Sequence, residues 1–179
     1  MSEEQWADTG DREVAHLANA RVMAAVRITV GLMWLTNAGW KTPPDFGEAS
    51  GRGLYRFTSE AVDHPAFAPF SWVVEEIILP NFTIFGWVVL LTEAALAAFL
   101  LLGLGTRLWA LVGAAQSAAI GLSVALAPNE WPWSYYLMVA AHAALFATAA
   151  GRTWGLDGLV RPALRRSPSR LSRLGLAAT

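Results

Sequence analysis

Two uncharged stretches determine the fold, Leu108 to Pro128 (LWALVGAAQSAAIGLSVALAP) and Trp131 to Gly151 (WPWSYYLMVAAHAALFATAAG). Each matches the roughly 20 apolar residues that a helix needs to cross the hydrocarbon core of a bilayer. Two further stretches, Arg21 to Trp40 and Thr83 to Leu104, reach this length if one ionisable residue in each is tolerated. The sequence therefore predicts an all-α integral membrane protein. It is expected to be an antiparallel bundle of four transmembrane helices, with spans at about 21–40, 83–104, 108–128 and 131–151.

The overall composition agrees with a membrane location. Of the 179 residues, 55% are hydrophobic and only 15% are charged, which departs from the average of soluble domains in the direction that favours lipid. Cysteine is absent, and this excludes disulfides, thiol redox chemistry, iron–sulfur clusters and cysteine-bound zinc. Any redox role must therefore use a different chemistry.

The distribution of Lys and Arg predicts the orientation, because cytoplasmic flanks of membrane helices carry an excess of these residues. With both termini inside, three basic residues lie outside, namely Lys41, Arg52 and Arg56. The basic residues inside are then Arg12, Arg21, Arg107, Arg152, Arg161, Arg165, Arg166, Arg170 and Arg173. The sequence thus predicts cytoplasmic N- and C-termini and a long extracytoplasmic loop over residues 41–82.

Three segments outside the spans have their own character. Residues 1–20 are predicted to form an acidic cytoplasmic leader that precedes a membrane domain over residues 21–160. Within the long loop, apolar residues recur at helical spacing from Phe67 to Ile78, which predicts a helix lying in the membrane interface. Residues 161–179 form a basic tail with no acidic residue after Asp157. Such a tail suits anionic lipids of the inner leaflet, and no nucleic-acid partner is expected.

Ionisable side chains within the spans are the candidate functional residues. Such residues are costly in lipid and usually face a bundle interior or a cavity, which makes Arg27, Glu93 and His142 candidates. Counting about 1.5 Å of rise per residue from the middle of each span places these three, together with Gln116, in one thin slab. We therefore expect Glu93 to be the counter-ion of Arg27, with His142 and Gln116 completing the network.

Two interpretations of this polar layer remain open. A quinone headgroup presents two carbonyl acceptors and takes up protons on reduction, so His and Arg donors beside a carboxylate would suit it. Alternatively, the layer only fixes helix register. Haem ligation by two histidines within the chain is not expected, because His16 and His64 lie outside the spans. Lys41 adds a cation at the outer end of the first span.

The chain resembles the DoxX/DoxD family of small four-helix membrane proteins over roughly residues 21–160. The resemblance rests on Arg27-Ile28-Thr29-Val30-Gly31, Gly39-Trp40-Lys41, Glu93 followed by Gly103, Thr106 and Arg107, and the closing Gly151-Arg152-Thr153-Trp154-Gly155-Leu156-Asp157. It implies a multi-pass protein of the prokaryotic cytoplasmic membrane. It also implies a redox subunit like DoxD, which interacts with quinone and oxidises thiosulfate to tetrathionate.

The resemblance also implies roles for individual residues. Lys41 and Arg27 would hold the anion or developing charge, while Glu93 and His142 would move protons. Trp34 and Trp40 would line the site of the quinone ring, and Gln116 would complete the cofactor site. The chain shows no metal, haem or flavin motif, so quinone is the only cofactor expected. In one respect the chain departs from the enzyme, because the second subunit of thiosulfate:quinone oxidoreductase is not fused to it.

Two other classes of function remain alongside this one. The first is a non-catalytic accessory subunit of a larger respiratory complex. Both this role and the catalytic one imply a partner subunit or a homo-oligomer. A small-solute transporter is disfavoured, because no span is interrupted by a break between half-helices.

Overall fold

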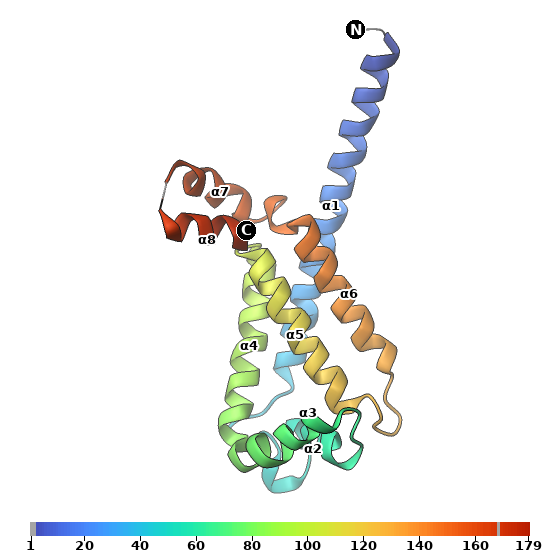
Figure 1. The fold of residues 1–179 in the computed structure, drawn as a ribbon, viewed down its shortest axis with the longest axis vertical. Helices are drawn as coiled ribbons and strands as arrows, with labels where there is room; N and C mark the ends of the chain where they lie inside the picture. Colours follow the sequence, from blue (N-terminus) through green and yellow to red (C-terminus); the bar gives the residue numbers. More distant parts are fainter. Residues whose placement is uncertain (1–2, 168) are drawn as a thin grey trace.

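The computed structural model describes residues 3–167 and 169–179, and the regular elements in these ranges are all helical. Four long helices form the body of the molecule (Figure 1). They are α1 (Glu3–Gly39), α4 (Phe82–Leu102), α5 (Thr106–Val124) and α6 (Pro132–Thr148). The side chains of residues 3–11 lie outside the description.

Three helical stretches of the described chain are long and apolar enough to cross a membrane. They are Arg12–Gly39, Ala68–Leu102 and Thr106–Val124. The fourth predicted span corresponds to α6, which has 17 residues and is shorter than the predicted 131–151. It ends early because Ala149 adopts a left-handed conformation, with φ of 47°, and a short 3₁₀ turn (Ala150–Arg152) follows.

The first helix is longer than the sequence predicted. Within the described residues, α1 runs without a break from Glu3 to Gly39, so residue 21 is not a structural boundary. Its N-terminal part extends beyond the other helices (Figure 1). The acidic leader is therefore the first part of α1 from residue 3 onward, while residues 1 and 2 lie outside the described chain.

The long loop folds into short helices across one end of the bundle (Figure 1). A 3₁₀ turn (Glu48–Ser50) precedes α2 (Gly53–Asp63), which the sequence analysis did not predict. The predicted helix near residues 67–78 is present as α3 (Ala68–Val73) followed by a π-helical turn (Val74–Ile78). A 3₁₀ turn (Leu79–Asn81) then leads into α4. We call this side of the molecule the loop end.

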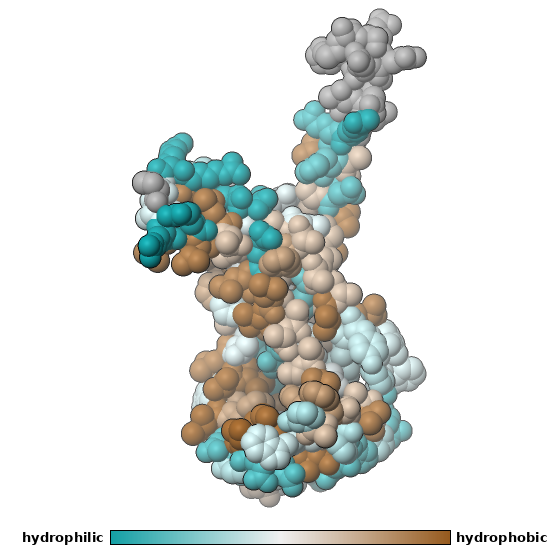
Figure 2. Space-filling model, in the orientation of Figure 1, coloured by the Kyte–Doolittle hydropathy of each residue, from teal (hydrophilic) through white to brown (hydrophobic). Residues whose placement is uncertain are grey.

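The opposite side is the arginine-rich end, where α4 turns into α5 and where α6 ends. Two amphipathic helices, α7 (Leu156–Arg166) and α8 (Arg170–Ala178), pack against each other there and project sideways from the bundle (Figure 1). Hydrophobic residues cover much of the bundle between the two ends, while hydrophilic residues gather at both ends (Figure 2). This distribution is that of a protein whose middle is embedded in lipid.

Close helix packing fixes which side chains face the interior. Helix α1 packs on α4, and a Cβ at Gly31 would lie 2.9 Å from Leu101 Cγ, so the two helices approach closely there. On α4 the buried positions Val89, Glu93 and Leu96 recur at intervals of three and four residues. This spacing places them on one face of the helix. Glu93 therefore faces the bundle and not lipid.

Candidate functional site

Arg27 lies at the arginine-rich end and is bonded to backbone carbonyls. Its Nη1 donates hydrogen bonds to the main-chain oxygens of Leu100 and Leu101, and its Nη2 donates to that of Trp154 at 2.8 Å. The last carbonyls of a helix lack partners within the helix and carry partial negative charge, so a buried guanidinium stabilises them. Arg27, which is 0% exposed, thus joins α1, the end of α4 and the segment after α6.

Asp157 stabilises the N-terminus of α5, as Arg27 stabilises the C-terminus of α4. Its carboxylate oxygens accept hydrogen bonds from the amides of Gly105 at 2.7 Å and Thr106 at 3.0 Å. A carboxylate at a helix N-terminus satisfies free N–H groups and complements the helix dipole. Glycine is required beside it, because a Cβ at Gly151 would collide with Thr106 Oγ1 and with the carboxylate of Asp157. We call this cluster the arginine junction, made of Arg27, Gly103, Thr106, Gly151 and Asp157.

His142 occupies a second, separate position in the bundle. Trp34 Nε1 donates to His142 Nε2 at 2.9 Å, so His142 Nδ1 carries the proton and donates to the main-chain oxygen of Met138 at 2.7 Å. Both ring nitrogens are therefore engaged in the neutral imidazole. A Cβ at Gly113 would collide with the His142 ring, which shows how tightly α5 approaches it. A smaller cavity of about 330 Å³ lies beside Trp34 and His142.

Lys41 and Glu93 form a buried ion pair at the third position, toward the loop end. Lys41 Nζ lies 2.5 Å from Glu93 Oε2 and donates a hydrogen bond to the main-chain oxygen of Asn37 at 2.9 Å. The exposed fractions of Lys41 and Glu93 are 5% and 0%. Glu93 Oε1 is also buried and makes no hydrogen bond of normal geometry in the described part of the chain, although the amide of Gln116 lies close enough to interact with this carboxylate. Such an unsatisfied oxygen is costly in a buried site and is available to a ligand.

Burial affects the titration of Lys41, which follows the last turn of α1. Loss of hydration lowers the pKa of its ammonium group, while the hydrogen bond to Glu93 and the charge of Glu93 act in the opposite direction. The ammonium group also lies 4.3 Å from the ring centroid of Trp40, a distance at which a cation is attracted to the ring face. Lys41 is thus held by a carboxylate, a helix-end carbonyl and an aromatic ring.

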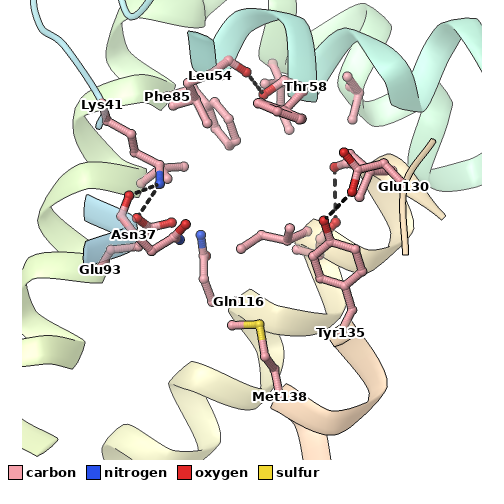
Figure 3. A pocket seen from close by; sticks show the side chains of 18 of the residues that line it. Asn37, Lys41, Leu54, Thr58, Phe85, Glu93, Gln116, Glu130, Tyr135 and Met138 are labelled. Atoms are coloured by element: carbon pink, nitrogen blue, oxygen red, sulfur yellow. Dashed lines mark hydrogen bonds and ion pairs between the residues drawn. The ribbon is translucent and has the colours of Figure 1, made fainter. Parts of the chain in front are cut away.

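This ion pair lines a cavity of about 530 Å³. Lys41 points into it from the segment just after α1, Glu93 and the amide of Gln116 point into it from α4 and α5, and α2 closes another side (Figure 3). Most of the remaining wall is apolar. The apolar wall includes Trp40, Leu54, Phe57, Phe70, Val74, Ile78, Phe85, Val89, Ile120, Val124 and Met138. We call this space the outer cavity.

A second carboxylate faces the outer cavity from the link between α5 and α6. Tyr135 donates a hydrogen bond from its hydroxyl to Glu130 Oε2 at 3.0 Å, and both residues line the wall across from Lys41 (Figure 3). Neither Glu130 nor Tyr135 is among the site residues predicted from the sequence. Their five-residue separation at the start of the fourth predicted span was the available signal. Asn37, whose carbonyl holds Lys41, was missed as well.

The expected single polar layer is therefore wrong. Arg27 does not pair with Glu93, because it bonds the end of α4 at Leu100 and Leu101. Eight residues separate Leu101 from Glu93, which is about 12 Å along a helix. Of the seven predicted site residues, the structure brings four together at the outer cavity, namely Lys41, Glu93, Trp40 and Gln116. Trp34 and His142 form a separate pair, and Arg27 belongs to the arginine junction.

Comparison with known proteins gives a family match. The family model described as "TQO small subunit DoxD" matches residues 22–174, which is most of the chain and contains all seven predicted site residues. No curated protein and no solved structure matches the chain.

Proposed function

We propose that this chain supplies the quinone site of a thiosulfate:quinone oxidoreductase. The chain belongs to the DoxD family, which is the family of small subunits of that enzyme. The outer cavity is the proposed site. Lys41 and Glu93 are its principal polar groups, with Gln116 and Glu130 completing it. The observation that supports this proposal is the buried Lys41–Glu93 pair on the wall of a cavity, with one carboxylate oxygen of Glu93 that makes no hydrogen bond of normal geometry to the described residues.

The proposal includes the membrane topology. Helix α6 is about 26 Å long at 1.5 Å per residue, close to the thickness of a hydrocarbon core, so we propose it as the fourth span. The excess of arginine at the arginine-rich end assigns that end to the cytoplasm. The outer cavity then lies toward the extracytoplasmic side of a prokaryotic membrane. The helices α2 and α3 would lie at the interface above it.

The size and lining of the outer cavity fit a quinone headgroup. Its volume of about 530 Å³ lies within the range of small-molecule sites, roughly 300–1,000 Å³. Apolar and aromatic side chains provide most of the wall, while Lys41 and Gln116 offer hydrogen-bond donors to carbonyl oxygens. A neutral, largely apolar ring with two acceptors therefore has complementary groups on the wall.

The charges of the outer cavity favour a neutral occupant over an anion. Its charged groups are one ammonium, Lys41, and two carboxylates, Glu93 and Glu130. A thiosulfate dianion would meet a net negative field there, and its only cation is already paired. The expected role of Lys41 and Arg27 as a joint anion site is therefore not retained, and Arg27 lies at another position.

The reaction requires two electrons and two protons at the quinone. Two thiosulfate ions form the sulfur–sulfur bond of tetrathionate and release two electrons, and the quinone takes up these electrons with two protons to give the quinol. Within the outer cavity, the ammonium group of Lys41 would stabilise negative charge developing on a carbonyl oxygen. Glu93 and Glu130, which accepts the hydrogen bond of Tyr135, would relay the two protons, each carboxylate taking up a proton and passing it on to the quinone.

Photolabelling of the full chain in lipid nanodiscs tests the site without requiring turnover. A quinone carrying an azido group on its ring is expected to label peptides of α4, α5 and the loop end, and excess unlabelled quinone should abolish labelling. The arginine junction serves as the internal reference for non-specific reaction, because none of its residues lines the outer cavity. Labelling that spreads evenly over lipid-facing peptides and resists competition would contradict the proposal.

The accessory role makes the opposite prediction for the same sample. A non-catalytic subunit would copurify with its complex, bind no quinone in competition, and tolerate Lys41→Met without loss of the activity of the complex. An exposed basic residue of the long loop, Arg52, provides the matched control, because Arg52→Met removes a positive charge without altering the outer cavity.

A further inference from the structure

We propose that the hairpin of α7 and α8 is a lipid-binding element that lies in the headgroup region of the leaflet at the arginine-rich end. Its leucines would enter the acyl boundary, and its arginines would bind anionic headgroups. This inference is independent of the redox function, because it concerns residues that do not touch the outer cavity.

The hairpin exposes large apolar side chains that its own packing does not cover. The exposed fractions of Leu159 on α7 and of Leu171 and Leu174 on α8 are 75%, 79% and 68%. Residues spaced by three fall on the same side of a helix, so Leu171 and Leu174 form one apolar stripe. In water such side chains would be a liability, whereas an amphipathic helix in the membrane interface buries them.

The charge of the hairpin has one sign. After Asp157, which is buried in the arginine junction, the sequence contains arginines but no acidic residue. Four of these arginines are exposed, namely Arg165, Arg166, Arg170 and Arg173. Basic residues near an anionic membrane surface are attracted to it. Exposed leucines beside unpaired positive charge are typical of helices that bind anionic lipid.

The position of the hairpin matches the edge of the lipid layer. Asp157 ties the first turn of α7 to the amides of Gly105 and Thr106, so the hairpin starts where α5 starts. Trp154, just before α7, is 63% exposed, as aromatic residues at the headgroup level often are. Figure 1 shows α7 and α8 directed away from the bundle at that level and not continuing its axis.

The hairpin is internally fixed, which makes its depth measurable. Leu164 packs on Gly175, where a Cβ would lie 3.0 Å from Leu164 Cδ1. Arg161 Nη1 donates a hydrogen bond to the main-chain oxygen of Leu176 at 3.0 Å, and Ser169 caps the first turn of α8 by accepting from the amide of Ser172. Labels on its surface therefore report how one rigid unit sits relative to lipid.

Spin labelling tests this proposal directly, because the chain has no cysteine and single-cysteine variants need no background substitutions. Leu159→Cys and Leu171→Cys would be labelled in the full chain, reconstituted without any partner in nanodiscs of phosphatidylcholine and phosphatidylglycerol. Arg165→Cys is the matched control, since Arg165 lies about 120° around α7 from Leu159 at 100° per residue. Collision with oxygen and with a water-soluble nickel chelate is compared at each position.

We expect labels at positions 159 and 171 to favour oxygen over nickel at least threefold more than the label at 165. The preference should decrease in discs of phosphatidylcholine alone or in high salt. Labels that are equally accessible to nickel at all three positions would overturn the proposal. They would indicate that the apolar face of the hairpin is exposed to water and binds a protein partner instead. Equal burial in neutral and anionic discs would overturn the role of the arginines.

Discussion

The two ends of the bundle both bury charged side chains, but they do so in different ways. At the arginine junction, Arg27 and Asp157 bond to main-chain groups of helix ends, and glycines bring the backbone segments into contact. At the outer cavity, Lys41 and Glu93 bond mainly to each other and face open space. Charged side chains that bond to the backbone hold the fold together. Charges that face a cavity remain available to a ligand.

Replacing Arg27 should give the largest effect and should be confined to stability. Arg27→Met leaves helix-end carbonyls and Asp157 without their buried cation, at a cost of about 3–5 kcal/mol. We expect the melting temperature in detergent to fall by roughly 10 °C. Arg21→Met is the control, because Arg21 is exposed on the same helix. A normal melting temperature together with a loss of quinone reduction would show that Arg27 acts in the reaction and not in stability.

Glu93→Gln should separate function from fold at the outer cavity. Loss of a proton-transfer group typically reduces turnover by about 10²–10⁴-fold. We expect quinone reduction by thiosulfate in the assembled enzyme to fall in this range, while the folded yield is retained.

A double variant sharpens this test. Lys41→Met alone leaves a buried carboxylate unpaired and should lower the melting temperature, and adding Glu93→Gln should restore much of that loss. Activity should stay low in all three variants. Recovery of activity together with stability would show that the pair is only structural.

Gly151→Ala should have a smaller effect, again on stability. The new methyl group would collide with Thr106 and Asp157, and overpacking of this kind costs about 1–3 kcal/mol. Gly39→Ala is the matched control, because no atom lies within 4 Å of a Cβ at Gly39. Equal melting temperatures for the two variants would mean that the arginine junction is looser than described.

The smallest effect is expected at the middle of the bundle. Trp34→Phe removes the donor to His142 Nε2, and a hydrogen bond of this kind contributes about 1 kcal/mol net. The melting temperature should fall by about 3 °C, and quinone reduction should remain within twofold of the parent chain. A large loss of turnover at an unchanged melting temperature would indicate that His142 transfers protons in the reaction.

The helical character and the long apolar helices could be predicted from local sequence. Apolar stretches of sufficient length predict α4 and α5 within a few residues, because hydrophobic length needs no knowledge of partners. The short helix α2 was missed because no side-chain cap marks its start, although its buried positions Leu54, Thr58 and Ala61 recur at helical spacing. The early end of α6 was also missed, because it depends on the conformation of Ala149.

The sequence by itself determined that Arg27, Glu93 and His142 would be buried, since they lie in apolar stretches and must face the interior, whereas the burial of Lys41 and Asp157 depends on tertiary contacts. Tertiary structure decided which of them meet. Counting depth from the middle of each span ignores the offset between helices and the reach of long side chains. Arg27 therefore meets the end of α4, and Lys41, which follows its helix, folds back to reach Glu93. Pairing between helices depends on register, and register is set by close packing such as that at Gly31, which only the folded chain contains.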